Sequence, residues 1–119
     1  MQVHAITKNI NMSAQKMREV VRQIQGLPAL QAQAVLAVVP RKGARFVSKT
    51  LRSAMANAED LKEHKAEYRD MNIDALRVKE AVAQTASTTR RFTPKARGSA
   101  GPILKRSCHV KITLSDDAG

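Results

Sequence analysis

The chain has 119 residues, and its 21 lysines and arginines against 10 aspartates and glutamates give a net charge of +11 at pH 7. This length favours a single domain, residues 1–119, with a modest core, and excludes a second domain with its own active cleft. The excess of cations indicates an anionic partner, which leaves nucleic acid, an acidic membrane surface or an acidic protein.

Two features of the sequence weaken the membrane alternative. No apolar run approaches the ~20 residues that cross a bilayer, so we expect no membrane span. The N-terminal stretch MQVHAITKNI lacks the apolar core of a signal peptide and the pattern of a transit presequence. The single cysteine, Cys108, cannot form an internal disulfide and fits a reducing compartment. We therefore expect the protein to remain in the cell or organelle that uses it.

The N-terminal third predicts a strand and two helices. Residues 2–10 carry a few apolar side chains among polar ones and predict a weak strand at best. Ser13 suits a helix N-cap; apolar residues at i, i+3, i+4 and i+7 follow it, and Gly26 ends that helix. The alanine-rich run 28–39 predicts a short helix that is buried on most of its surface and ends at Pro40.

A third and longest helix is predicted from about Arg41 to His64. Its apolar stripe consists of Ala44, Val47, Leu51, Ala54, Met55 and Ala58. A separate basic stripe at i, i+4, i+8 and i+11 consists of Arg41, Arg45, Lys49 and Arg52. Like charges at this spacing repel one another, so the stripe indicates an anion on that face. For the smaller basic set on the first helix, Lys16, Arg18 and Arg22, a solvated face and phosphate contacts both remain open.

The acidic residues gather in one part of the chain. Six of the ten lie between Glu59 and Asp74. Such a run is typical of a solvated helix end and loop, and we assign it no chemistry. Together with the cations elsewhere, it predicts a molecule with one end for a polyanion and another for solvent.

Within residues 84–115 every charged residue before Asp116 is basic, and Phe92 is the only large apolar side chain before Pro102. Such a segment cannot bury enough surface to offset its ordering entropy, so it is either disordered or shaped by an anionic partner. Alternating apolar runs flank it and predict the strands of a long hairpin. The inward side chains are predicted to be Leu76, Val78 and Val82 in the first run, and Cys108, Val110, Ile112 and Leu114 in the second.

The hairpin divides the predicted domain into a globular body, residues 1–83 and 107–119, and an extended arm, residues 84–106. About ten residues per strand at roughly 3.3 Å each would project the arm ~30 Å from the body. A two-stranded ribbon of that length is not stable alone in water. A partner outside the protein must therefore hold it.

The sequence shows no catalytic or metal-binding pattern. The three histidines are isolated, and Cys108 and His109 should point to opposite faces of their strand. There is no G-x-S-x-G nucleophile motif and no phosphate-cradling loop of the Walker or dinucleotide type. We therefore expect no enzyme, no metal site and no cofactor, with catalysis as the weaker alternative.

The arm also indicates which kind of nucleic acid the protein binds. Proteins that read DNA sequence usually present one helix to the major groove, which would leave the arm unexplained. Phe92 is the only aromatic residue in the arm, so the stacking platforms of single-strand binders are missing. The partner that remains is a large folded RNA, recognised by its shape and phosphates and penetrated by the arm.

Residues 90–114 carry a pattern of a known family. The matching residues are Arg90, Pro94, Lys95, Ala96, Arg97, Gly98 and Ser99, then His109 and the alternating Val110, Ile112 and Leu114. The stretches SAQKMREVVRQIQG (13–26) and SAMANAE (53–59) agree with it as well. In these motifs the chain resembles the universal large-subunit ribosomal protein twenty-two (the "L twenty-two" family) over nearly its whole length. It departs at Lys95, where the family usually has arginine, and at Gly101-Pro102, where relatives carry charged residues.

The resemblance implies an α+β fold of three helices packed on a small three-stranded antiparallel sheet, with a long β-hairpin projecting from the body. It also implies a structural constituent of the large ribosomal subunit that binds large-subunit ribosomal RNA, supports subunit assembly and forms part of the nascent-peptide exit tunnel wall. Its partners would be that RNA, neighbouring large-subunit ribosomal proteins and the nascent peptide, with no homo-oligomer. The setting would be the cytoplasmic ribosome of a bacterium or, alternatively, an organellar ribosome.

The sequence and the resemblance together predict two sets of site residues. The RNA-binding set is cationic and consists of Lys16, Arg18, Arg22, Arg41, Arg45, Lys49, Arg52, Arg90, Arg91, Lys95, Arg97, Lys105, Arg106, His109 and Lys111. The hairpin-tip set, expected to face the tunnel, consists of Thr89, Arg90, Arg91, Phe92, Pro94 and Lys95.

Overall fold

The computed structural model describes residues 2–86, 88–94, 98 and 100–116. Its main sheet is antiparallel in the order β1-β5-β2, with β1 at Gln2–Ile10, β2 at Arg77–Thr85 and β5 at Cys108–Ser115. The helices are α1 at Ala14–Val21, α2 at Ala29–Val38 and α3 at Lys42–His64, and two short 3-10 turns follow at Ala66–Tyr68 and Ile73–Ala75. This confirms the predicted α+β fold of three helices and a three-stranded antiparallel sheet.

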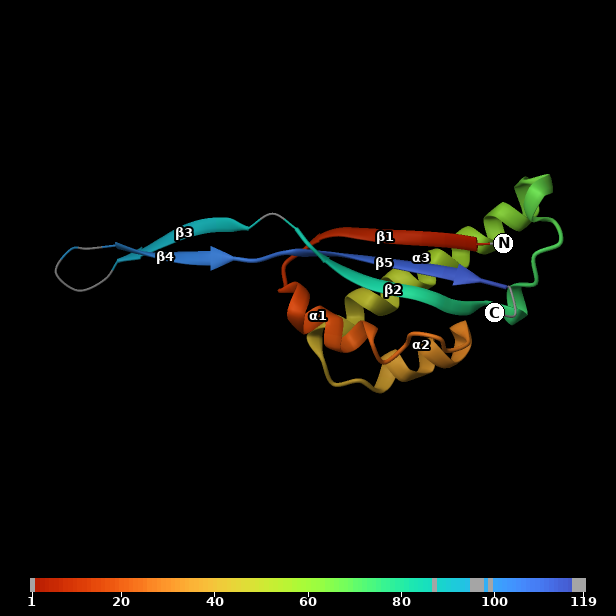
Figure 1. Ribbon diagram of the computed structural model, residues 1–119, viewed down its shortest axis with the longest axis horizontal. Helices are drawn as coiled ribbons and strands as arrows, with labels where there is room; N and C mark the ends of the chain where they lie inside the picture. The colour runs from red at the N-terminus through yellow and green to blue at the C-terminus, as the bar shows by residue number, and fades with distance from the viewer. Residues whose placement is uncertain (1, 87, 95–97, 99, 117–119) are drawn as a thin grey trace.

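The helices lie on one side of the main sheet (Figure 1). Strand β3 (Thr89–Pro94) pairs antiparallel with β4 (Ala100–Lys105), and this ladder is separate from the main sheet. Figure 1 shows it beyond one end of the sheet, which gives the molecule its extents of 67 × 28 × 20 Å. The acidic segment 59–74 lies at the opposite end, as the sequence predicted.

The central strand β5 follows the predicted alternation. Its four inward residues Cys108, Val110, Ile112 and Leu114 have no exposed surface. Both neighbouring strands pair with β5, which supplies its backbone hydrogen bonds on either edge. His109 and Lys111 point to the other face and are half-buried, so the predicted opposite orientation of Cys108 and His109 is confirmed.

The strand predicted at residues 2–10 is confirmed as β1, which spans all nine residues, so the local pattern understated it as weak. It pairs with β5 from Gln2 to Thr7 and buries Val3 and Ala5. A bulge follows Thr7, where Asn9 has a φ of 57°, and it restores an inward position for Ile10. The local pattern is broken because a bulge shifts the alternation by one residue.

A bulge in β2 makes its inward-facing residues differ from the predicted ones. The register with β5 shifts between Val78 and Glu80. Val78 faces the core as predicted, but beyond the bulge Ala81 and Ala83 are buried while Val82 is only half-buried on the other face. Two small alanines therefore face the core where the sequence predicted a valine. Their small side chains leave room for α1, which packs against β2.

Helix α1 begins at the predicted cap but ends early. The Ser13 hydroxyl oxygen accepts a hydrogen bond from the Lys16 N–H at 3.4 Å, which confirms the N-cap. The helix stops at Val21, and irregular turns lead to Gly26, whose φ is +78°. The Gly26 N–H then donates to the carbonyl of Val78 at 2.8 Å. After α1 the chain therefore runs along the outer edge of β2 and covers part of it.

Helix α2 is less buried than predicted. Only Ala29, Ala32 and Leu36 are buried, whereas Leu30 and Val38 are 67% and 78% exposed. The expectation of burial on most of its surface is therefore wrong, because α2 packs mainly against α3 and nothing covers its outer side among the described residues.

Helix α3 follows the predicted apolar stripe closely. Five of its six predicted residues are buried, and Met55 is half-buried. Leu51 lies at the centre of the stripe and has no exposed surface. Thr50, also buried, bonds the Thr7 hydroxyl at 2.6 Å and donates to the Phe46 carbonyl, which ties α3 to β1. This fixes which side of α3 faces solvent.

Candidate nucleic-acid interface

The outward side of α3 carries the predicted basic stripe. All four members, Arg41, Arg45, Lys49 and Arg52, are exposed. They line an open groove of about 640 Å³ between α3 and α2, with the half-buried Phe46 in its lining. The packing of α3 forces this arrangement, since its buried stripe leaves only the opposite side for charge. The groove presents four cations and no carboxylate among its lining residues.

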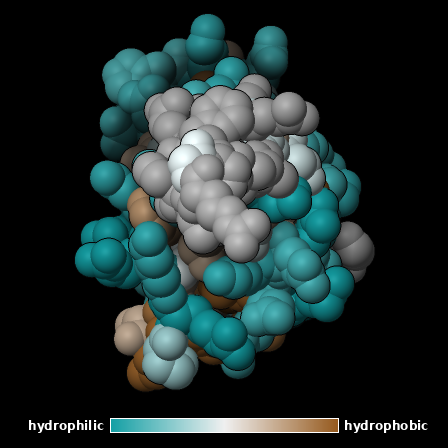
Figure 2. Space-filling model, turned by 90° about the vertical axis from the view of Figure 1, so that its left-hand side faces the viewer, coloured by the Kyte–Doolittle hydropathy of each residue, from teal (hydrophilic) through white to brown (hydrophobic). Residues whose placement is uncertain are grey.

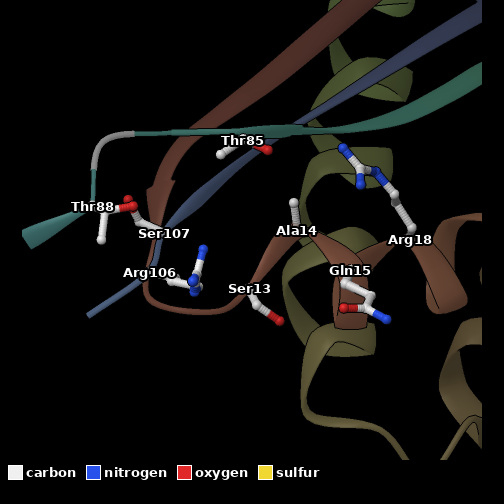
Figure 3. Close-up of a pocket in the computed structure, with 8 residues that line it drawn as sticks. All are labelled: Ser13, Ala14, Gln15, Arg18, Thr85, Thr88, Arg106 and Ser107. Atoms are coloured by element: carbon white, nitrogen blue, oxygen red, sulfur yellow. The ribbon is translucent and has the colours of Figure 1, made fainter. Parts of the chain in front are cut away.

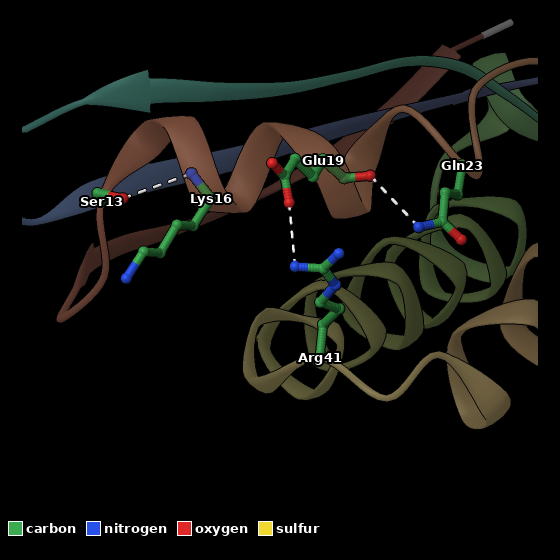
Figure 4. Close-up of polar contacts among 5 residues, drawn as sticks. All are labelled: Ser13, Lys16, Glu19, Gln23 and Arg41. Carbon is green, nitrogen blue, oxygen red and sulfur yellow. Dashed lines mark hydrogen bonds and ion pairs between the residues drawn. The ribbon is translucent and has the colours of Figure 1, made fainter.

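One member of the stripe already has an anionic partner within the protein. A terminal nitrogen of Arg41 lies 3.2 Å from a carboxylate oxygen of Glu19 on α1 (Figure 4). Both side chains are at least half exposed, so the pair contributes little to stability. It does hold Arg41 toward α1, and this leaves Arg45, Lys49 and Arg52 as the stripe residues without a carboxylate partner among the described residues.

The three cations of the first helix do not form one face. Lys16 and Arg22 are exposed, and Arg22 is the C-terminal cap residue of α1. Arg18 turns back toward the sheet and donates from Nε to the carbonyl of Ala83 at 3.2 Å. Part of its role is therefore structural, a contact that spacing along a helix cannot predict.

The cations of the predicted arm divide into three groups. Arg90 and Arg91 lie in β3, and Lys105 and Arg106 lie at and just after the end of β4. Lys95 and Arg97 lie outside the described residues. Of the predicted tip, Thr89, Phe92 and Pro94 fall within β3, and their backbones pair with Lys105, Pro102 and Ala100.

His109 and Lys111 lie on the face of the sheet opposite the helices. The Asn9 N–H donates to Nδ1 of His109 at 3.0 Å. Nδ1 is therefore the acceptor atom of the ring in this contact. Neither residue is near the α3 groove, so the predicted RNA-binding set is spread over two faces and one end of the molecule.

The described residues show neither a metal site nor a membrane-spanning helix. Among them, no three histidine, cysteine, aspartate or glutamate side chains come close enough to hold a metal ion. No helix in the described ranges is both long and apolar enough to pass through a bilayer. Burial raises the pKa of the Cys108 thiol, and the nearby charge of Arg18 lowers it in part.

The end of the body next to β3 and β4 has a mainly hydrophilic described surface, while apolar surface shows at the lower edge (Figure 2). At this end Arg18 and Arg106 line one pocket, although 88 positions separate them in the sequence. Five uncharged polar residues line it too, namely Ser13, Gln15, Thr85, Thr88 and Ser107. The sequence marks Ser13 only as a helix N-cap and gives no signal for the other four, because polar residues of these types are common at helix starts and in turns.

Comparison with known proteins gives one consistent result. Residues 5–115 match the family described as "Ribosomal protein L22p/L17e". A large ribosomal subunit protein uL22 from Akkermansia muciniphila is 43% identical over 119 residues, which is the whole of both chains. The protein of the same name from Opitutus terrae is 44% identical over 116 residues, covering 98% of this chain and 96% of that one.

Proposed function

The chain belongs to the ribosomal protein L22p/L17e family, and on this premise we propose that it is a structural constituent of the large ribosomal subunit that binds large-subunit ribosomal RNA. The observation that carries the RNA-binding role is the exposed cationic groove of α3, whose described lining residues include no carboxylate. Members of this family are ribosomal proteins and not enzymes, in agreement with the prediction from the sequence.

The family also suggests binding partners and a cellular setting for this chain. We propose that a single copy contacts the RNA and neighbouring ribosomal proteins in the cytoplasmic ribosome of a bacterium, since both compared relatives are bacterial. The cations fit phosphate contacts, which position a protein on RNA without reading its sequence. The gathering of acids at the opposite end favours one orientation, because that end would be repelled by phosphates.

The groove can be tested by the salt dependence of binding to a large-subunit ribosomal RNA fragment. Replacing Arg45 and Lys49 by glutamine should reduce the slope of log K against log salt by up to about 1.4 to 1.8, at roughly 0.7 to 0.9 per lost phosphate contact. The matched control replaces Lys62 and Arg69, an exposed pair toward the acidic end, and removes the same charge. If the two double variants have equal slopes, the stripe is only a solvated surface.

We further propose that residues 84–106 act as an arm that supports assembly and forms part of the exit tunnel wall. This rests on the pairing of β3 with β4 alone, outside the main sheet, and on family membership. Deleting residues 89–100 should leave the body folded, because every described buried core residue lies outside this segment.

The test incorporates the shortened protein into subunits and measures both subunit yield and the response to a macrolide or a stalling peptide. We expect normal yield with an altered tunnel response. A collapse of yield with a folded body would make the arm primarily an assembly element. If neither quantity changes, the placement in the tunnel is wrong.

A further inference from the structure

A pocket of about 470 Å³ lies where the body meets the β3–β4 ladder (Figure 3). Three segments distant in sequence build it: the start of α1, the end of β2 with its link to β3, and the link from β4 to β5. The lining residues are Ser13, Ala14, Gln15, Arg18, Thr85, Thr88, Arg106 and Ser107. The fold alone creates this junction, because β2 and β5 pair up to the point where the other two strands begin.

The lining offers hydrogen-bond donors and positive charge. Arg18 and Arg106 each carry a fork of N–H groups, and no described carboxylate lies within ion-pair distance of either. The bond from Arg18 Nε to Ala83 anchors that guanidinium and leaves its two terminal amino groups for another acceptor. The Ser13 oxygen accepts from Lys16, and its hydroxyl hydrogen remains a donor.

These groups select a ligand class. Two guanidinium forks with hydroxyl donors suit a phosphate, which accepts several hydrogen bonds at once. The positive end of α1 begins at the same pocket and adds to the attraction for an anion. The described lining residues include no aromatic side chain, so they offer no stacking surface for a base. The volume exceeds that of a single phosphate and leaves room for the adjoining sugar.

We propose that this pocket binds a backbone phosphate of RNA and thereby fixes the β3–β4 ladder relative to the body. The pairing of the main sheet ends at Thr85 and Cys108, and the second ladder begins at Thr89 and Lys105. At the junction the Ala86 N–H donates to the Ser107 carbonyl at 3.1 Å. Because the junction belongs to neither ladder, it should resist bending less than a continuous ladder would.

A phosphate held by both arginines would join the two sides of this junction. Arg18 belongs to α1 in the body, and Arg106 belongs to the link after β4. The ligand would therefore couple RNA binding on the body to the direction of the ladder. The choice of RNA as the source of the phosphate rests on the proposed function, whereas the phosphate site itself does not.

The first experiment uses the free full-length protein and inorganic pyrophosphate as the probe, followed by NMR. We expect the amide signals of Gln15, Arg18 and Ser107 to shift, and hydrogen exchange of the Ala86 amide to slow. Arg106→Gln should weaken pyrophosphate binding about tenfold, the effect of losing charge-assisted hydrogen bonds. Lys62→Gln, which removes an equal charge far from the pocket, should leave binding within about twofold. Shifts spread evenly over all cationic surfaces would overturn the phosphate site.

The second experiment measures binding of the same variants to a large-subunit ribosomal RNA fragment. Arg106→Gln lies in an exposed link and leaves the core untouched, and Arg18→Lys keeps the charge while removing the guanidinium fork. We expect both to weaken RNA binding more than Lys62→Gln does.

Two outcomes separate this inference from the proposed function. If pyrophosphate binds in the pocket but both variants bind RNA as Lys62→Gln does, the site takes free phosphate and the RNA assignment is wrong. If the groove variants lose RNA affinity while the pocket variants do not bind pyrophosphate differently from wild type, the inference fails and the proposed function stands.

Discussion

Replacing Leu51 by alanine tests how α3 is held on the sheet. Leu51 has no exposed surface and lies in the middle of the buried stripe. The change removes three carbons, which at ~0.8 kcal/mol per buried methylene amounts to about 2.4 kcal/mol. The cavity left behind adds to this, and measured costs of such changes run from about 2.7 to 5.0 kcal/mol. We expect a loss of roughly 3 to 4 kcal/mol in the free energy of unfolding.

The matched control is the same substitution at Leu30, on the outer side of α2. This side chain is 67% exposed, so only about a third of the transfer energy is at stake, and no closed cavity forms. The expected loss is below ~1 kcal/mol. Both changes replace leucine by alanine within a helix, so differences in helix propensity cancel between them.

The measurement is urea unfolding followed by circular dichroism, with the midpoint and slope compared among the three proteins. At roughly 4 °C per kcal/mol for a domain of this size, the thermal melting midpoint should fall by about 12 to 16 °C for Leu51→Ala and by less than ~4 °C for Leu30→Ala. Equal losses at the two positions would refute the reasoning. They would mean that α2 is packed on its outer side and that its exposed leucine is a contact of the native fold.

Two further predictions concern a turn and a buried thiol. Gly26→Ala should cost about 1 to 2 kcal/mol of stability in the same unfolding assay, since the φ of +78° strains any other residue although no atom lies within 4 Å of the added carbon; an unchanged midpoint would show that the turn relaxes. Burial raises the pKa of Cys108 above its ordinary value of 9.0, so the native thiol should react with a disulfide reagent much more slowly than the urea-unfolded thiol. As pH rises, the thiol of the unfolded protein ionises before the native thiol does. The stability that the protonated Cys108 contributes is therefore present below the unfolded pKa and is lost as pH rises above it. Equal labelling rates for native and unfolded protein would contradict the burial of Cys108.

Much of the fold follows from local patterns. Alternation over residues 108–114 determines which side of β5 is buried, because successive side chains on a strand point to opposite faces. The 3.6-residue period does the same for α3, and it places the basic stripe by exclusion on the solvent side. The N-cap at Ser13 is equally local, since its bond spans three residues.

The tertiary structure alone determined the features that depend on two distant segments. The bulges in β1 and β2 moved Ile10, Ala81 and Ala83 inward, and their registers are set by pairing with β5 and not by their own sequence. The exposure of α2 follows from its packing mainly against α3, which leaves Leu30 and Val38 in solvent.

The candidate phosphate pocket is the clearest such case. Arg18 and Arg106 are both visible in the sequence as cations, but nothing in a one-dimensional pattern brings positions 88 residues apart to one cavity. They line one pocket because β2 and β5 are paired up to the junction and α1 packs against β2. The charge and the amphipathic faces can be predicted from the sequence, since they depend on neighbours along the chain. Which charges line the same pocket depends on chain folding, because it brings distant segments together.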